Sequence, residues 1–402
     1  ASTINEAMKQ AAVNAIAGLA RETPSDVAAR AYGGEARLFG KDSLIPAPFD
    51  PRLILRVAPA VAMAAMESGV ATRPIADFPA YCERLERFVF RSGFVMRQIF
   101  AAAKKAPKRV IYADGEDERV LRASEVLIEE GIAKPILVGR PAVIETRLKR
   151  YGLSIRPGRD FDVVNPEDDP RYRDYVQTYV EIAGRRGITP DAARTLVRTS
   201  TTVIAALALR RGEADAMICG LEGRYRAKLR HIRDIVGLAP GAREFAAMSL
   251  MITSRGIVFL TDTHVQAEPS AEAMADTVLM CAAHVERFGI TPKVALVAHS
   301  DFGDFDTPVT LRMRSALAMI HARAPNLEID GEMQADTALI EAVRQRKLPS
   351  STLKGEANLL VMPGLTSANV AYQVMKVFGD ALPVGPILLG TAKPAHILTG
   401  SV

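Results

Sequence analysis

Short apolar runs recur along most of the chain, separated by stretches with helical patterning. The runs fall at residues 110–112, 135–138, 216–219, 256–260, 294–297 and 358–362. Strands that alternate with helices of about 10–15 residues form βαβ units. Strands that are apolar along their whole length belong to sheets covered on both faces. The sequence therefore predicts an α/β fold with mainly parallel sheets.

The first hundred residues have a different pattern. Apolar residues recur at helical spacing over residues 4–20, and a second helix is expected to end near Gly69. A longer helix is expected over residues 78–104, where it would connect two modules and could also form a dimer contact. A helical region thus precedes the α/β part.

Composition excludes several classes of protein. The chain has 402 residues, 49% hydrophobic and 24% charged, which is enough to bury more than one core. Its net charge of +5, its lack of Trp and its 6% aromatic content give little reason to expect a nucleic-acid partner. The three cysteines form no Cys/His cluster, so we expect neither a metal site nor a disulfide framework. No apolar run reaches the roughly 18 residues of a membrane span, and we expect a cytoplasmic protein.

Residues 1–75 carry the strings STINEAMKQAAVNAIAGLA, RLFGKDSLIPAPFDPRLI and VAPAVAMAAMESGVATRPI. These strings resemble the end of the NAD(P)-binding domain of bacterial malic enzymes. The resemblance implies that residues 1–77 are the helical remnant of a Rossmann-type domain, and that the sites for NADP and for Mg or Mn lie upstream. Because the chain begins at Ala1 with a capping box, we expect a fragment of a longer protein. This fragment is expected to hold no cofactor and not to decarboxylate malate.

Residues 91–402 carry further strings in a fixed order: APKRVIYADGEDERVLRAS, GIAKPILVG, GEADAMICG, LAPG, IDGEMQADTAL, ANLLVMPGLTSANVAYQ and GPILLGTAKP. This order resembles phosphotransacetylases, which exchange acetyl groups between phosphate and coenzyme A. The resemblance implies an isocitrate/isopropylmalate dehydrogenase-like fold of two domains with a cleft between them. After the linker helix expected at 78–104, it places one subdomain at 105–241 plus 385–402 and the other at 242–384. Large fused NADP-dependent malic enzymes resemble this combination of modules.

Acetyl transfer needs a base and several phosphate donors, for which arginine is well suited. Carrying the family's positions over, one upstream arginine falls on Ala183 or Gly184, and a lysine falls on Phe302. The C-terminal Ser-Arg pair becomes Thr399 and Gly400, and the family's following Asp has no counterpart. Arg230 alone is retained. We therefore expect no catalytic residues in this domain.

The predicted function is that of a regulatory, oligomerising region of a malic enzyme, which binds acetyl-CoA or CoA without transferring the acetyl group. Two alternatives remain: an active phosphate acetyltransferase and a purely structural assembly module. The expected partners are the rest of the malic enzyme chain and further copies of this chain. The candidate residues for the effector cleft are Arg185, Arg186, Arg226, Arg230, Ser300, Asn369, Lys393 and Thr399. For the basic run that contains Arg226 and Arg230, a solvated helix face is the default interpretation, and binding of CoA phosphates is the alternative.

Other polar patterns are not expected to form sites. The adjacent triplet 299–301 (His-Ser-Asp) cannot form a hydrolase triad, because neighbouring side chains point in different directions. His264 near Asp262 is expected to make a hydrogen bond at a strand end rather than bind a metal. Glu332 and Asp336 are expected to be a solvated or strand-end pair.

Overall fold

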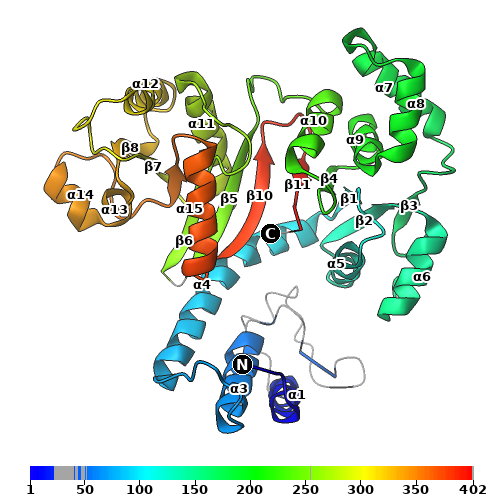
Figure 1. Ribbon diagram of the computed structural model, residues 1–402, viewed down its shortest axis with the longest axis horizontal. Helices are drawn as coiled ribbons and strands as arrows, with labels where there is room; N and C mark the ends of the chain where they lie inside the picture. Colours follow the sequence, from blue (N-terminus) through cyan, green and yellow to red (C-terminus); the bar gives the residue numbers. More distant parts are fainter. Residues whose placement is uncertain (22–39, 41–43, 47–49, 51, 254, 401–402) are drawn as a thin grey trace. The chain divides into compact units, whose positions relative to one another are not determined.

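The computed structural model describes residues 1–21, 40, 44–46, 50, 52–253 and 255–400, with the backbone alone at residues 86–95 and 97 (Figure 1). The chain forms two compact units. Unit 1 comprises Ala1–Ala102 and Ile252–Ile257, and unit 2 comprises Ala103–Met251 and Val258–Val402.

Unit 1 is helical, as predicted. Its helices are α1 (Glu6–Arg21), α3 (Arg52–Glu67) and most of α4 (Phe78–Lys105). Asn5 starts α1, because its side chain accepts a hydrogen bond from the Met8 backbone N–H at 3.0 Å. The same side chain donates to Ser68 Oγ at 2.8 Å, just after α3. Met8 and Leu19 are buried where the two helices pack together.

The first half of unit 2 is built on a five-stranded sheet in the order β11-β4-β1-β2-β3, in which every adjacent pair is parallel. Its strands are β1 (Lys108–Tyr112), β2 (Ala133–Val138), β3 (Asp162–Val164), β4 (Ala216–Cys219) and β11 (Ala395–Ile397). Its helices are α5 (Glu118–Glu129), α6 (Pro141–Tyr151), α7 (Tyr172–Ala183), η1 (Gly184–Arg186), α8 (Pro190–Thr199), α9 (Thr201–Arg211) and α10 (Tyr225–Ile235).

Both faces of this sheet are buried, because neighbouring residues of a strand point to opposite sides. Ile111 belongs to a core formed with α7, α8, α9 and α10, whereas Tyr112 belongs to a core formed with α5 and α6. α9 lies in the middle of the first core and is buried from Thr202 to Leu209. The arrangement is a three-layer α/β/α half, in agreement with the predicted fold class (Figure 1).

The second half of unit 2 is built on a six-stranded sheet in the order β10-β5-β6-β9-β7-β8. Its strands are β5 (Ala246–Thr253), β6 (Gly256–Thr261), β7 (Lys293–Val297), β8 (Glu328–Met333), β9 (Leu359–Val361) and β10 (Leu382–Leu389). Its helices are α11 (Ala271–Arg287), α12 (Pro308–Arg323), α13 (Ala335–Leu339), α14 (Glu341–Lys347) and α15 (Leu365–Phe378). β6, β9, β7 and β8 pair in parallel.

The last strands of the chain join the two halves. β10 forms an edge of the six-stranded sheet, and β11 pairs with β4 in the five-stranded sheet. The chain therefore returns to the first half between Leu389 and Ala395. The boundary expected at residue 385 falls inside β10, because this strand pairs with the second sheet before the chain turns back.

Candidate functional site

α10 carries two of the five basic side chains predicted for the effector site. Arg226 and Arg230 are one helical turn apart, so both lie on the same exposed face. Arg230 Nε lies 4.0 Å from Asp234 Oδ2, and its side chain is 82% exposed. Arg186 reaches the same carboxylate from η1, with Nη1 2.9 Å from Oδ1. Arg226 and Arg230 of α10, together with the neighbouring Arg186 of η1, are called the α10 basic face below.

The position at which the phosphotransacetylase resemblance expects an upstream arginine lies in the core. Ala183 is the last residue of α7 and is 3% exposed, so a longer side chain could not enter there without displacing its neighbours. Gly184 begins η1. Arg185 and Arg186 follow it and are exposed, and Arg185 has no partner among the residues that the structure describes.

Ser300 is fully buried in the loop that follows β7. Its hydroxyl hydrogen bonds to Asp304 Oδ1 at 2.6 Å and to Glu332 Oε1 at 2.9 Å. Glu332 is also fully buried; it accepts from Gly303 N–H at 3.0 Å and lies 3.4 Å from Arg314 Nε. In this conformation Ser300 is not accessible to a ligand. Glu332 lies near the end of its strand but is not solvated, because these partners bury it.

Lys393 and Asn369 hold elements together. Lys393 Nζ donates to the carbonyl oxygens of Leu209 at 2.8 Å and Arg210 at 3.1 Å, in the last turn of α9. A cation is stabilised at this end of a helix by the exposed carbonyl dipoles. Asn369 Nδ2 lies 3.3 Å from the carbonyl oxygen of Thr263, which links α15 to the loop after β6.

The remaining positions expected to differ from the family lie as follows. Phe302 has a positive φ of 51° and packs against the core of the six-stranded sheet. Thr399 is half-buried and Gly400 is exposed. A Cβ atom at Gly400 would lie 2.9 Å from Arg119 Nη1, the end of a flexible side chain. Neither Phe302 nor Gly400 supplies the cation that the resemblance expects at its position.

Three aromatic rings connect the two halves of unit 2. The Tyr225 ring of α10 lies 4.9 Å from the His264 ring, which lies 5.9 Å from the Tyr372 ring of α15. The hydroxyl groups of Tyr225 and Tyr372 are buried, and neither has a hydrogen-bond partner among the described residues. An unpaired buried hydroxyl costs about 1–3 kcal/mol. We call Tyr225, His264 and Tyr372 the aromatic junction; a bound polar group could satisfy its hydroxyls. The sequence gives no signal that joins these three residues.

The loop that carries His264 is fixed by a buried acid. Asp262 is 4% exposed and accepts the backbone N–H groups of His264 and Val265 at 2.9 Å and of Gln266 at 3.1 Å. Burial raises the pKa of the Asp262 carboxyl, although these hydrogen bonds oppose the shift. His264 Nδ1 lies 2.8 Å from Thr263 Oγ1, so a strand-end hydrogen bond is present at this position.

Because His264 and His396 are largely buried, we expect the protein to lose stability in acid. Burial lowers the pKa of His264 to about 4 and that of His396 to about 4, from an ordinary value of 6.5. The unfolded chain therefore binds protons first as the pH falls from about 6.5 to about 4, and each histidine should remove up to roughly 3 kcal/mol of stability over this window. Urea unfolding between about pH 5 and pH 7 measures the slope.

The matched variants for this prediction are His396→Gln and His321→Gln. His396→Gln should flatten the dependence of unfolding free energy on pH, because it removes one buried titrating group. His321 is exposed on α12, so its replacement should leave the slope unchanged. Equal slopes for the wild-type chain and His396→Gln would contradict the prediction.

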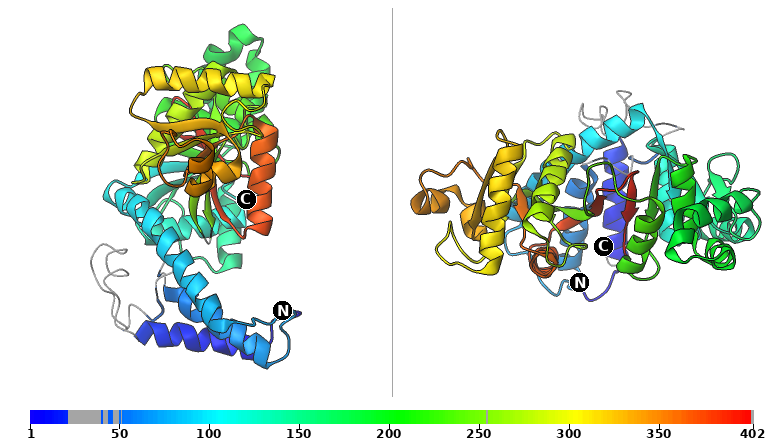
Figure 2. Two further views of the ribbon diagram at one scale, coloured as in Figure 1. Left: turned by 90° about the vertical axis from the view of Figure 1, so that its left-hand side faces the viewer. Right: turned by 90° about the horizontal axis from the view of Figure 1, so that it is seen from above.

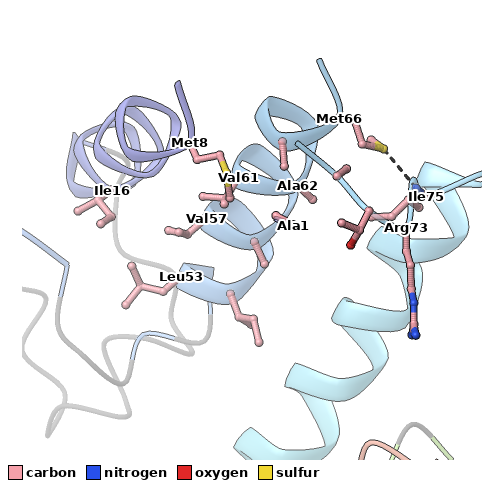
Figure 3. Close-up of a pocket in the computed structure, with 15 residues that line it drawn as sticks. Ala1, Met8, Ile16, Leu53, Val57, Val61, Ala62, Met66, Arg73 and Ile75 are labelled. Atoms are coloured by element: carbon pink, nitrogen blue, oxygen red, sulfur yellow. Dashed lines mark hydrogen bonds between the residues drawn. The ribbon is translucent and has the colours of Figure 1, made fainter. Parts of the chain in front are cut away.

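An apolar cavity lies within unit 1, between α1 and α3 (Figure 3). It has a volume of about 810 Å³ and an apolar lining that includes Met8, Leu53, Val57 and Val61. At one end the backbone N–H of Ile75 donates to Met66 Sδ at 3.2 Å. The lining contains no residue of the α10 basic face or of the aromatic junction.

The described part of the chain shows neither a metal cluster nor a membrane-spanning helix. Within the described ranges, no group of three or more His, Cys, Asp or Glu side chains is placed to hold a metal ion. Among the described helices, none combines the length and the apolar character that crossing a bilayer requires.

The sequence profile of the phosphate acetyl/butaryl transferase family matches residues 94–402. The chain therefore belongs to this family. It is 33% identical to a phosphate acetyltransferase of Paracoccus denitrificans over 309 residues, which cover 75% of this chain and 92% of the relative. The solved phosphotransacetylase from Streptococcus pyogenes superposes with a TM-score of 0.71 at 25% identity, covering 76% of this chain and 92% of that structure.

Over its whole length the chain is similar to malic enzymes. It is 64% identical to an NAD-dependent malic enzyme of Rhizobium meliloti over 403 residues, covering 100% of this chain and 52% of the relative. It is 49% identical to the NADP-dependent malic enzyme of Escherichia coli, covering 99% of this chain and 53% of that protein. The chain thus spans about half the length of these relatives.

Proposed function

We propose that this chain is the regulatory and oligomerising C-terminal region of a cytoplasmic malic enzyme, and that it binds acetyl-CoA without transferring the acetyl group. The observation that carries the proposal is a family fold whose expected cationic positions hold Ala183, Phe302 and Gly400. Losing one such donor typically lowers an enzyme's rate by about 10²–10³-fold. The loss of several at once supports a binding role rather than catalysis.

The α10 basic face is the proposed site for the phosphate groups of CoA. Arg226 has no partner among the residues that the structure describes. Arg230 makes only a long ion pair, with its Nε 4.0 Å from Asp234 Oδ2. Exposed guanidinium groups with unused donors form charge-assisted hydrogen bonds to phosphate. The aromatic junction also includes a residue of α10, Tyr225, whose buried hydroxyl lacks a partner among the described residues. A polyanionic ligand with a polar acyl end fits both features.

Replacing Arg226 by Ala should weaken acetyl-CoA binding by about 10- to 150-fold, because one charge-assisted contact contributes about 1.5–3 kcal/mol. Calorimetric titration of acetyl-CoA into the full 402-residue chain measures this change. Arg122→Ala is the control, since Arg122 is an exposed helical arginine that already pairs with Glu118 at 2.9 Å. An absence of heat for the wild-type chain at about 1 mM ligand would exclude the proposed binding.

An active phosphate acetyltransferase is the second candidate, and the 33% identity to the Paracoccus enzyme favours it. The two functions differ in a direct assay of CoA and acetyl phosphate. Under our proposal, acetyl-CoA should form no faster with the protein than without it. Appreciable turnover would support the active acetyltransferase.

The rest of the malic enzyme is the proposed partner of unit 1. Residues 1–93 lie outside the family match, while the malic relatives match them and are about twice as long as this chain. The apolar groove between α1 and α3 presents side chains that a further domain could cover (Figure 3).

A further inference from the structure

His264 lies at the end of a short chain of buried hydroxyl groups. Its Nδ1 lies 2.8 Å from Thr263 Oγ1, which in turn lies 2.9 Å from Ser249 Oγ. Thr263 is 0% exposed and Ser249 is 1% exposed, and within the described residues their hydroxyls have no other partner. These hydrogen bonds therefore decide which imidazole nitrogen carries the proton.

Only one direction of the chain places both hydroxyl protons in hydrogen bonds. If Ser249 donates to Thr263 and Thr263 donates to His264 Nδ1, both buried protons are paired. In the opposite direction the Ser249 proton would have no acceptor, which costs about 1–3 kcal/mol in a buried site. Nδ1 is thus the acceptor, and the proton of the neutral imidazole is on Nε2. Burial favours this neutral form, because it lowers the pKa of His264 to about 4.

The Nε2–H group is a donor that the protein itself does not use. Among the residues that the structure describes, Nε2 has no hydrogen-bond partner, and the imidazole is half-buried, so a ligand can reach it. The neighbouring acid, Asp262, does not accept from Nε2, because its carboxylate oxygens accept the backbone N–H groups of residues 264–266.

Two further neutral groups flank the imidazole. The Tyr225 ring lies 4.9 Å from it at an interplanar angle of 36°, and the Tyr372 ring lies 5.9 Å from it at 74°. Both hydroxyls are buried without a partner in the described part of the chain, and Tyr372 is 2% exposed. Figures 1 and 2 show the helices that carry them, α10 in green and α15 in orange-red, in different halves of unit 2. The aromatic junction thus gathers three neutral groups that can donate.

Neutral donors suit an uncharged acceptor. Phosphate is bound best by guanidinium groups, which the α10 basic face supplies, whereas a carbonyl oxygen needs only N–H or O–H groups directed at it. In an acyl-CoA the long, flexible pantetheine arm separates the thioester carbonyl from the phosphates. The two ends of the ligand therefore do not need to contact the same face of α10.

We propose that His264 Nε2–H and the hydroxyls of Tyr225 and Tyr372 bind the carbonyl oxygen of the acyl group, so that the chain distinguishes acyl-CoA from CoA. The proposal rests on the acetyl-CoA binding proposed above. It assigns to the aromatic junction the part of the ligand that CoA lacks. A site built from such donors rejects an analogue without the acceptor, because the donors would lose their water and gain no partner.

The test is calorimetric titration of the full 402-residue chain, in a buffer without phosphate, with acetyl-CoA, S-ethyl-CoA and CoA. S-ethyl-CoA has nearly the shape of acetyl-CoA but carries a methylene group in place of the carbonyl. We expect acetyl-CoA to bind about 10-fold more tightly than S-ethyl-CoA, which corresponds to about 1.4 kcal/mol, the contribution of one or two neutral hydrogen bonds. His264→Ala should abolish this preference by weakening the binding of acetyl-CoA alone.

Tyr225→Phe keeps the ring and removes only the hydroxyl, so it should reduce the preference about 3-fold without disturbing the fold. Tyr172→Phe is the matched control, because the Tyr172 hydroxyl already donates to the carbonyl oxygen of Arg194 at 3.0 Å, and this variant should keep the full preference. Arg226→Ala should weaken all three ligands by the same factor, since all three carry the phosphates. Circular dichroism and the thermal midpoint of each variant show whether it is folded.

Equal affinity of the wild-type chain for acetyl-CoA and S-ethyl-CoA overturns the carbonyl subsite and leaves CoA binding at the α10 basic face standing. An absence of heat with all three ligands overturns the proposed function and the subsite together. A preference that survives both His264→Ala and Tyr225→Phe shows that the carbonyl is bound elsewhere, and it overturns the assignment to the aromatic junction.

Discussion

Replacing Arg344 by Ala should destabilise the six-stranded half by about 4 kcal/mol. Arg344 lies on α14 and is 0% exposed. Its Nη1 donates to the carbonyl oxygens of Thr337 at 3.0 Å and Ala338 at 3.3 Å, and its Nη2 to those of Leu353 at 3.0 Å and Gly355 at 2.5 Å. Among the described residues, no carboxylate pairs with it. Alanine would leave these carbonyls unpaired and create a cavity.

Urea unfolding followed by circular dichroism measures this loss, with Arg346→Ala as the control. Arg346 lies on the same helix but is exposed, so its replacement should change stability by no more than about 0.5 kcal/mol. Arg344→Lys should recover only part of the loss, because an ammonium group cannot span carbonyls on two sides as the planar guanidinium does. Equal midpoints for Arg344→Ala and Arg346→Ala would show that the buried arginine is not required.

Gly220→Ala should destabilise the five-stranded half by about 3 kcal/mol. Gly220 follows β4 and has a φ of +117°, which is unfavourable for a residue with a side chain. A Cβ atom there would lie 2.7 Å from Ile397 Cγ2 and 2.8 Å from the carbonyl oxygen of Leu398. The variant would therefore push the end of β11 away from β4.

Gly223→Ala separates the conformational cost of a positive φ from the cost of the steric contact with β11. Gly223 also has a positive φ, +85°, but its nearest potential contact is Lys228 Cε at 3.6 Å. It should therefore carry the conformational cost alone, about 1 kcal/mol. Hydrogen exchange gives a local measurement, since the Leu398 N–H donates to the Cys219 carbonyl at 2.7 Å and should lose protection in Gly220→Ala only. Equal losses in both variants would mean that contact with β11 is unimportant.

The strands that could be predicted are those whose sequence is a short apolar run. β1, β2, β4, β6, β7 and β9 correspond to the short apolar runs that are bounded by turn residues and helical stretches. β5 (AAMSLMIT) was not predicted, because Ala and Met favour helices over strands. β8 (EIDGEM) contains the buried acids Asp330 and Glu332, whose partners come from distant loops. Asp330, for example, accepts from Ser351 Oγ at 2.6 Å, a contact that no local pattern reveals.

Single residues of the candidate site could be predicted from the sequence, but the contacts between them could not. The sequence indicated Arg186 and Arg230 separately, but their shared contact with Asp234 depends on how η1 and α10 pack. The aromatic junction combines α10, the loop after β6 and α15, so its members have no common periodicity. Ser300 was expected in a cleft, and its burial follows from acidic partners that the sequence does not connect to it.

The pairing of β11 with β4 has a consequence for synthesis of the chain. Lys393, which caps α9 just before β11, is 184 residues away from its acceptor Leu209. At about 5–20 residues per second, the ribosome needs roughly 10–40 s to add the stretch between them. During that time the outer edge of β4 and the last carbonyls of α9 have no native partner. The half of unit 2 that emerges first is therefore completed last, and its exposed edge is the part of the nascent chain that would most benefit from a chaperone.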